Sequence, residues 1–248
     1  MNHLEIREVS KAFGSRKIIN NLRFEVAKGE VLAIVGESGS GKSTLLNMIG
    51  LLERVDSGEI LLKGKALPDI NSKEATLIRR DEINYIFQTN ALISEKTVKD
   101  NLLIAMEFVN LKSADKLDQI KNILNTLGIE DLIDQKINTI SGGEAQRVAL
   151  ARCILKPGDL ILADEPTGSL DPARAGEVFR LLISLRDDFN KTIIIVTHDM
   201  DLARKCDRII EIKRGWVFGL ILFIVHLSEL SERKRAKQKT TCYAGGGI

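Results

Sequence analysis

A glycine-rich segment with a lysine and two hydroxyl residues follows the apolar run Val31–Val35. It reads Gly-Glu-Ser-Gly-Ser-Gly-Lys-Ser-Thr over residues 36–44 and leads into a mostly apolar stretch. The glycines let successive backbone N–H groups turn toward a phosphate, and a helix that begins near Lys42 adds the positive end of its dipole. The spacing is that of a phosphate-binding P-loop, in which Lys42 reaches the β- and γ-phosphates and Ser43 gives a hydroxyl to Mg²⁺. The expected nucleotide-binding residues of this loop are Gly36, Ser38, Gly39, Ser40, Gly41, Lys42, Ser43 and Thr44.

Two adjacent carboxylates end a second apolar run. Leu160–Ala163 is followed by Asp164 and Glu165. Because the carboxyl ends of parallel strands meet at one edge of a sheet, we expect both acids beside the phosphates. Asp164 would hold Mg²⁺, while Glu165 would take the proton of the water that attacks the γ-phosphate, a role worth roughly a hundred- to ten-thousand-fold in rate. The alternative is that the two acids only cap the segment that follows.

Further short motifs surround these two in a fixed order. Residues 140–147 read Ile-Ser-Gly-Gly-Glu-Ala-Gln-Arg, which resembles the signature sequence of the ATP-binding cassette (ABC) family. The other matches to that family are Phe13, Gln88 in Tyr85-Ile86-Phe87-Gln88, Ser169-Leu170-Asp171, and Thr197-His198-Asp199. The resemblance covers about residues 1–214. Within the family, the chain looks most like the ATP-binding subunits that serve lipoprotein release and macrolide, peptide or bacteriocin export.

The resemblance implies an ATP site shared between two chains. Ser141, Gly142 and Gly143 would form an anion-binding turn at the start of a helix. In a head-to-tail dimer with a second ABC ATPase subunit, this turn would close on the ATP held by the other chain. Asp171 would line the interface between the two sites. Hydrolysis would then loosen the dimer, because the bound ATP bridges its two halves.

The resemblance also implies roles for three single residues, each of which has a plainer alternative. His198 is expected to contact the γ-phosphate, although a histidine after a strand can be only a helix cap. Gln88 would ligate Mg²⁺ and couple the site to a membrane partner, although it could be a solvated loop amide. Phe13 is placed to stack on adenine, although an isolated aromatic residue is more often part of the core.

Apolar runs that alternate with helical stretches predict an α/β fold. Four runs, 31–35, 85–87, 160–163 and 193–196, predict a mainly parallel sheet with helices on both faces. Alternating segments at Leu4–Val9, Leu22–Val26 and Glu59–Leu62 predict a separate antiparallel sub-sheet. Helical periodicity over about 89–155 predicts a helical lobe that presents the signature and receives the membrane partner. We therefore expect a P-loop NTPase fold, with one ABC ATPase domain over residues 1–215.

The segment after Gly215 departs from the family pattern. Residues 216–225 are strongly apolar, and residues 233–239 form a basic run. The apolar part is too short to span a bilayer, which takes roughly twenty residues. We expect residues 216–248 to form an atypical tail, for which three alternatives stay open. It could be a helix on the membrane surface anchored by the basic run, a helix packed against the body, or a non-native terminus.

Composition indicates an intracellular chain. The three cysteines form no disulfide framework, and the first residues do not resemble a secretory signal. The net charge of +2 gives no general attraction to nucleic acid, which is not expected as a partner. Together with the family resemblance, these features predict a peripheral protein at the cytoplasmic face of the cell membrane.

The leading hypothesis is the ATP-hydrolysing subunit of a membrane exporter, with the permease on separate chains because no spanning segment is present. Its cargo would be a peptide, bacteriocin, lipoprotein or macrolide-like substrate. One alternative is a non-transport ABC ATPase that acts on ribosomes or nucleic acid, but no long coiled coil separates Lys42 from Asp164 and only one cassette is present. Another is a regulatory cassette that binds ATP without hydrolysing it, which Glu165 and His198 disfavour.

Overall fold

A six-stranded sheet forms the centre of the molecule in the computed structural model, which describes residues 2–87, 91–168, 172–213 and 216–221. Its strands, in spatial order, are β10 (Trp216–Ile221), β9 (Arg208–Lys213), β3 (Val31–Val35), β8 (Thr192–Val196), β7 (Leu160–Asp164) and β6 (Ile83–Ile86). Five of them run parallel, and β10 pairs antiparallel with β9. All residues of β3 and β8 are buried, as expected of parallel strands covered on both faces. The predicted parallel core is confirmed.

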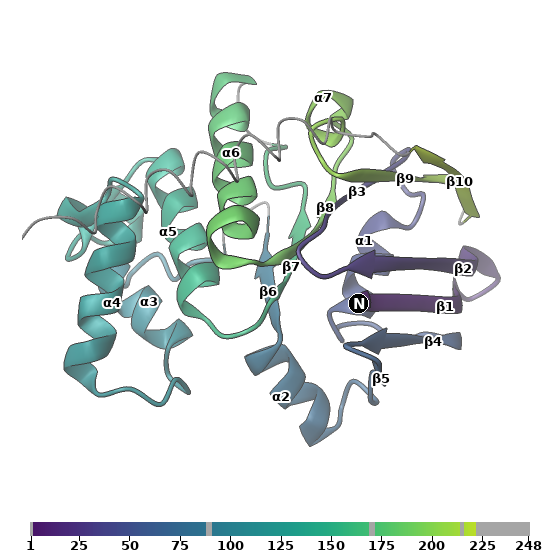
Figure 1. The fold of residues 1–248 in the computed structure, drawn as a ribbon, viewed down its shortest axis with the longest axis horizontal. Helices are drawn as coiled ribbons and strands as arrows, with labels where there is room; N and C mark the ends of the chain where they lie inside the picture. The colour runs from purple at the N-terminus through teal and green to yellow at the C-terminus, as the bar shows by residue number, and fades with distance from the viewer. Residues whose placement is uncertain (1, 88–90, 169–171, 214–215, 222–248) are drawn as a thin grey trace, which may run out of the picture.

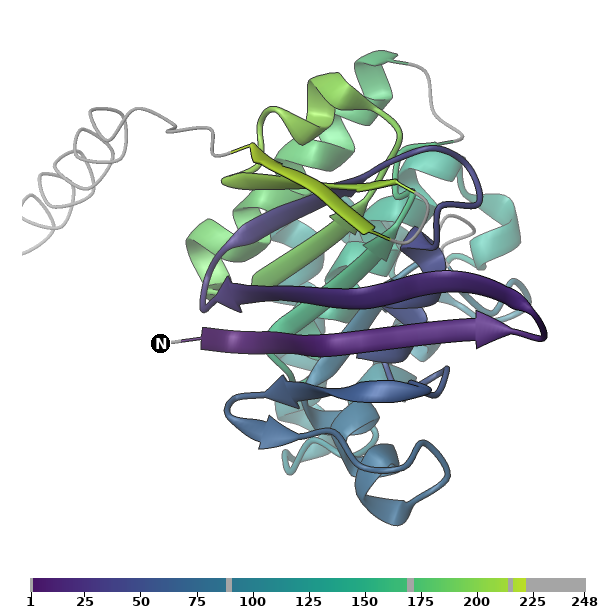
Figure 2. The same cartoon turned by 90° about the vertical axis from the view of Figure 1, so that its right-hand side faces the viewer.

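A second, antiparallel sheet lies beside the first. It contains β2 (Arg16–Ala27), β1 (Asn2–Phe13), β4 (Ser57–Leu62) and β5 (Lys65–Ala66), in that order. Figure 2 shows β1 and β2 crossing in front of the larger sheet. Helix α1 (Lys42–Ile49) gives its apolar side chains to the core that joins the two sheets. The sub-sheet expected from the alternating segments is therefore present.

Most of the remaining helices cover the other face of the large sheet or form a lobe at one end. Figure 1 shows α3 (Val98–Ala105), α4 (Ser113–Thr126) and α5 (Gly142–Leu155) together in this lobe. They share one apolar core, while α6 (Pro172–Phe189) and α7 (Met200–Ala203) pack with α5 against the sheet. The other elements are α2 (Lys73–Asp81) and two 3₁₀ turns, Glu130–Leu132 and Ile137–Thr139. Among the described residues, no helix has the length and apolar character needed to cross a bilayer.

The segment after Gly215 begins differently from our expectation. We expected an atypical tail from residue 216, but Trp216–Ile221 forms strand β10, in register with β9 from Trp216 opposite Lys213 to Ile221 opposite Ile209. An apolar run with β-branched and aromatic residues suits such a strand. The large sheet therefore extends past the predicted domain boundary. Residues 222–248, which contain the basic run, lie outside the described part of the chain.

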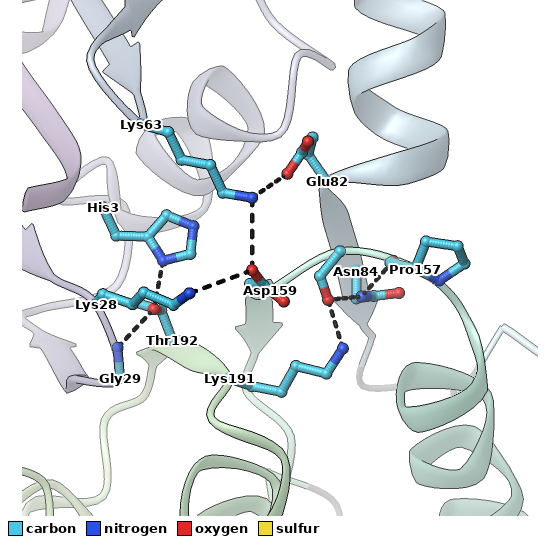
Figure 3. Close-up of polar contacts among 11 residues, drawn as sticks. His3, Lys28, Gly29, Lys63, Glu82, Asn84, Pro157, Asp159, Lys191 and Thr192 are labelled. Atoms are coloured by element: carbon cyan, nitrogen blue, oxygen red, sulfur yellow. Dashed lines mark hydrogen bonds and ion pairs between the residues drawn. The ribbon is translucent and has the colours of Figure 1, made fainter.

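A polar network closes the amino-terminal edge of the large sheet, opposite the P-loop (Figure 3). The Nδ1 atom of His3 lies 2.5 Å from the hydroxyl of Thr192 at the start of β8, and this hydroxyl also accepts from the Gly29 amide. Lys63 pairs with Glu82 and Asp159 at the starts of β6 and β7. These contacts tie the small sheet to the large one at the edge away from the candidate site.

Candidate functional site

The P-loop joins the carboxyl end of β3 to helix α1. Gly41 is the N-cap of α1 with φ +102°, and a Cβ atom there would lie 2.7 Å from the Cδ1 atom of Ile19. Only glycine takes this conformation in this space without strain. The ammonium of Lys42, the first residue of α1, donates to the carbonyl oxygens of Gly36 and Glu37 at 2.8 and 2.9 Å. The loop is therefore wrapped around its own lysine.

The hydroxyls of the P-loop differ in what they contact. That of Ser40 is available to a ligand, and that of Ser43 faces Asp164 at the end of β7. The hydroxyl of Ser40 is buried and has no hydrogen-bond partner among the described residues. Such a buried polar atom is unfavourable unless a ligand or water satisfies it. Ser38 and Gly39 line a pocket of about 270 Å³ together with Arg16 and Lys17 at the start of β2. Thr44 is half-buried in the first turn of α1.

Ser43 and Asp164 together present two oxygen ligands for a metal ion. The Ser43 hydroxyl donates to Asp164 Oδ1 at 3.1 Å, across the gap between α1 and the end of β7. Burial raises the pKa of the Asp164 carboxyl, and the hydrogen bond from Ser43 partly offsets this effect. A nearby cation would favour the charged form of Asp164. No group of three or more His, Cys, Asp and Glu side chains able to hold a metal occurs in the described ranges. A hydroxyl with one carboxylate suits Mg²⁺, which usually takes its other ligands from substrate phosphates and water.

Glu165 and His198 lie side by side at the same edge. His198, just after β8, places its Nδ1 atom 3.0 Å from Glu165 Oε2. The pair is close but lacks the alignment of a hydrogen bond. His198 is largely exposed, with 71% of its side-chain surface accessible, while Glu165 is mostly buried. The carboxylate oxygen is therefore held in a protected position next to an open imidazole.

The signature segment begins helix α5. Ser141 is its N-cap and forms a capping box, in which the Ser141 hydroxyl accepts from the Glu144 amide and the Glu144 carboxylate accepts from the Ser141 amide. Gly142 and Gly143 follow, and a Cβ atom at either would meet no atom within 4 Å. Ser141 and Gly143 line a pocket of about 280 Å³ shared with α6, and no P-loop residue lines it. The turn therefore faces open space on the helical lobe.

Phe13 lies at the end of β1 with 51% of its surface exposed, so it is not a core side chain. The ammonium of Lys11 is 5.1 Å from the centre of its ring. Lys11 is itself buried and forms ion pairs with Glu53 at 2.8 Å and Asp56 at 3.1 Å. Asp56 also accepts from the Ala12 amide at 2.7 Å. This arrangement was not predicted from the sequence, because nothing in the type or position of Lys11 marks it as a neighbour of the ring.

Two predicted site residues cannot be placed. Gln88 and Asp171 lie outside the described residues, and so do Ser169 and Leu170. Apart from Phe13 at the end of β1, the structure brings the other predicted residues to two surfaces. Lys42, Ser43, Asp164, Glu165 and His198 meet at the carboxyl edge of the large sheet, whereas the signature turn lies on the helical lobe.

Comparison with known proteins decides which family this arrangement represents. Residues 19–168 match the family model described as ABC transporter. The chain belongs to the ABC transporter family. Its fold, its ATP-binding motifs and its relatives make it an ATPase cassette of that family.

Two curated relatives and one solved structure illustrate the similarity. The cassette is 40% identical over 202 residues to the macrolide export ATP-binding/permease protein MacB of a Shewanella species, which covers 82% of this chain and 31% of the relative. It is 36% identical over 214 residues to the lipoprotein-releasing system ATP-binding protein LolD of Bacteroides thetaiotaomicron, which covers 86% and 98%. The cassette therefore spans only about a third of the length of the MacB relative.

The similar solved structure is that of the ATP-binding cassette MJ0796, a dimer in a post-hydrolysis state with bound ADP and Pi. Its sequence identity to this cassette is 33%, its TM-score is 0.78, and the match covers 88% of this chain and 98% of that one. The predicted family and fold class are confirmed.

Proposed function

We propose that this cassette hydrolyses Mg²⁺-ATP to power export through a separate membrane permease. The observation that carries the proposal is the meeting of the Lys42 ammonium, the Ser43–Asp164 pair and the Glu165–His198 pair at one edge of the sheet. This set contains a phosphate cradle, oxygen donors for a metal and a carboxylate that can accept a proton. These are the parts that phosphoryl transfer to water requires.

Each residue has a distinct task in the reaction. The P-loop amides and Lys42 bind the β- and γ-phosphates. Ser43 and Asp164 would hold Mg²⁺, which would supply positive charge to offset that of the phosphate oxygens. Glu165 orients the attacking water and accepts its proton while the oxygen of that water bonds to the γ-phosphorus and the bond to ADP breaks. His198 stabilises charge on the γ-phosphate from its open position beside Glu165.

The active form we propose is a head-to-tail dimer with a second ABC ATPase subunit, another copy of this chain or a related one. The open space in front of Gly142 and Gly143 supports this arrangement, because it leaves the signature turn free to contact the nucleotide of a second chain. The dimeric state of the MJ0796 cassette also supports it. Gln88 and Asp171 keep their predicted roles, at the metal and at the interface between the sites.

The permease would dock in a groove between the helical lobe and strand β6. This groove has a volume of about 350 Å³, and Tyr85, Ile104 and Phe108 are among the residues that line it. Phe108 is 68% exposed and Ile104 is 49% exposed, and the guanidinium of Arg80 lies 4.7 Å from the centre of the Phe108 ring. Exposed apolar side chains gathered in a groove are typical of a protein interface. A permease docked there would hold the cassette at the cytoplasmic face of the membrane.

The cargo class we propose follows the relatives. LolD and MacB are named for lipoprotein release and macrolide export. We therefore propose that the permease exports a lipoprotein, macrolide-like compound, peptide or bacteriocin, and that the cassette itself makes no contact with the cargo.

Mass spectrometry of proteins that co-purify with the tagged cassette from detergent-solubilised native membranes tests the proposal. We expect a permease to co-purify in stoichiometric amount with the parent chain. The same result is expected for Leu77→Glu, which alters an exposed apolar residue outside the groove. We expect Phe108→Glu to lose the permease while it retains ATP hydrolysis. Ribosomal proteins or nucleic acid in place of a permease would overturn the transport role.

A further inference from the structure

A buried glutamine of the signature helix contacts the segment that follows the catalytic strand. Gln146 lies in the second turn of α5, and only 4% of its surface is exposed. Its side-chain Nε2 donates to the carbonyl oxygen of Pro166 at 2.6 Å. The bond joins α5 to the segment that follows the next element of the chain, β7. A buried amide kept beside a carbonyl in this way restrains both elements, because breaking the bond would leave two polar groups unsatisfied.

The segment that Gln146 holds has an unusual backbone. Glu165 has φ +46°, in the left-handed region that residues with a Cβ atom rarely adopt. Two backbone hydrogen bonds support this turn, from the Glu165 amide to the Val196 carbonyl at 2.9 Å and from the Gly168 amide to the Glu165 carbonyl at 3.1 Å. The bond from Gln146 is a third support, at the Pro166–Thr167 peptide, one residue beyond Glu165. Strained conformations persist only where their surroundings fix them in this way.

We propose that Gln146 is a positioning residue for ATP hydrolysis, which fixes the turn at Glu165–Pro166 and so aims the Glu165 carboxylate at the attacking water. The proposal rests on the role given to Glu165 in the proposed function. Gln146 touches neither substrate nor metal and acts only through Glu165. Gln146 belongs to α5, whose N-cap is Ser141. A change in the position of this signature helix would therefore change the direction in which the Glu165 carboxylate points. Small misplacements of a catalytic group are costly, since a shift of about 1 Å can lower the rate about a hundredfold.

The variant Gln146→Met tests this role, because methionine has a similar length and shape but no donor. Asn84→Leu is the matched control. Asn84 is 1% exposed, and its side-chain amide donates to the carbonyls of Pro157 and Gly158 at 3.1 and 3.2 Å (Figure 3). It thus makes the same kind of buried bond at the opposite end of β7. Gln146→Met loses one buried amide–carbonyl contact and Asn84→Leu loses two, and only the contact of Gln146 lies next to Glu165.

We expect kcat for ATP to fall tenfold to a hundredfold in Gln146→Met, with the Kd for ATP within about twofold of the parent value. We expect Asn84→Leu to keep kcat within about twofold while its melting temperature falls as much as that of Gln146→Met. If Gln146→Met fails to fold, Gln146→Asn gives the same comparison, because its amide is one methylene too short to reach Pro166.

Hydrogen exchange without nucleotide gives a readout independent of activity. We expect the amides of Glu165 and Gly168 to exchange faster in Gln146→Met and at the parent rate in Asn84→Leu. An unchanged kcat in Gln146→Met, or an equal loss of kcat in Asn84→Leu, would overturn the inference. If the parent cassette itself hydrolyses no ATP, the proposed function fails instead, and unchanged exchange at Glu165 in Gln146→Met would then separately refute the restraint.

Discussion

The ring of Phe13 has one face occupied by the ammonium of Lys11, so only the other face is free to stack on a base. Lys11 is held in place by Glu53 and Asp56, and Asp56 also binds the backbone beside the ring. These contacts fix the ring at the end of β1 although half of its surface is exposed. A preorganised aromatic surface of this kind suits adenine, since stacking of a base on an aromatic side chain contributes about 1–3 kcal/mol.

Replacement of Phe13 tests the stacking role. We expect Phe13→Ala to raise KM for ATP about tenfold and to leave kcat within about twofold, because the ring contacts only the base. Inhibition by tripolyphosphate, which has no base, should be unchanged. An equal weakening of ATP binding and of inhibition by tripolyphosphate would mean that Phe13 supports the P-loop and does not contact adenine.

Single residues differ in how far the sequence predicts their place. Lys42, Ser43 and Asp164 were predictable, because their motifs place them at the start of the helix after β3 and at the end of β7, which lie at the same edge of the sheet. Lys11 was not, since its contact with Phe13 depends on how the end of β1 packs against the loop that holds Glu53.

At the scale of elements, the start of β1 is joined to the start of β8 by the contact of His3 with Thr192. Burial, and the positive charges of Lys63 and Lys28, lower the pKa of His3, while Asp159 and Glu82 raise it by less. The unfolded chain, with a pKa near 6.5, therefore takes up a proton before the folded one does as the pH falls. Stability contributed by neutral His3 is complete above that value and is lost as the pH falls below it.

We expect the parent cassette to lose unfolding free energy between pH 7.5 and pH 5.5 through this group. His3→Gln, which can still bind Thr192 but does not titrate, should lose less unfolding free energy over the same range. Denaturant unfolding of both proteins at the two pH values measures the difference. An equal loss in the two proteins would assign the pH dependence to other groups.

Strand β10 gives a second test at this scale. A chain that ends at Gly215 lacks β10 and leaves the edge of β9 unpaired, whereas a chain that ends at Ile221 keeps the pairing. We expect the melting temperature of the chain that ends at Gly215 to lie about 2–4 °C or more below that of the parent. The chain that ends at Ile221 should have the melting temperature of the parent. Both should hydrolyse ATP below their melting temperatures, because no proposed site residue follows His198. Equal melting of both truncated chains would show that β10 contributes nothing to stability.

The sequence predicted the elements whose pattern is uniform. Val31–Val35 was predicted with its observed bounds, since a strand buried on both faces is an unbroken apolar run. Strand β9 was not singled out, because Arg208 and Glu211 interrupt its apolar residues. Arg208 is accommodated there by an ion pair with Glu30 at 2.7 Å, which depends on tertiary contacts. The strand at Trp216 was missed for a related reason, as short apolar runs do not distinguish a strand from a helix.

At the scale of the whole molecule, the signature turn and the P-loop lie on different parts of one chain, and the proposed dimer brings them together. Gly143→Asp tests this directly. The new side chain meets open space within the chain, and a carboxylate in the first turn of α5 favours the helix. We expect unchanged or higher thermal stability, together with loss of ATP-dependent dimer formation in sedimentation velocity. Retention of the dimer would place the signature turn away from the second nucleotide.

The most direct test of the account is phosphate release from Mg²⁺-ATP by the parent cassette and by Glu165→Gln, with ATP affinity measured alongside. We predict that both bind ATP with similar Kd and that the variant releases phosphate at least about a hundredfold more slowly, because the amide cannot accept the proton of the attacking water. Equal rates of phosphate release would contradict the role of Glu165 and, with it, the proposed mechanism.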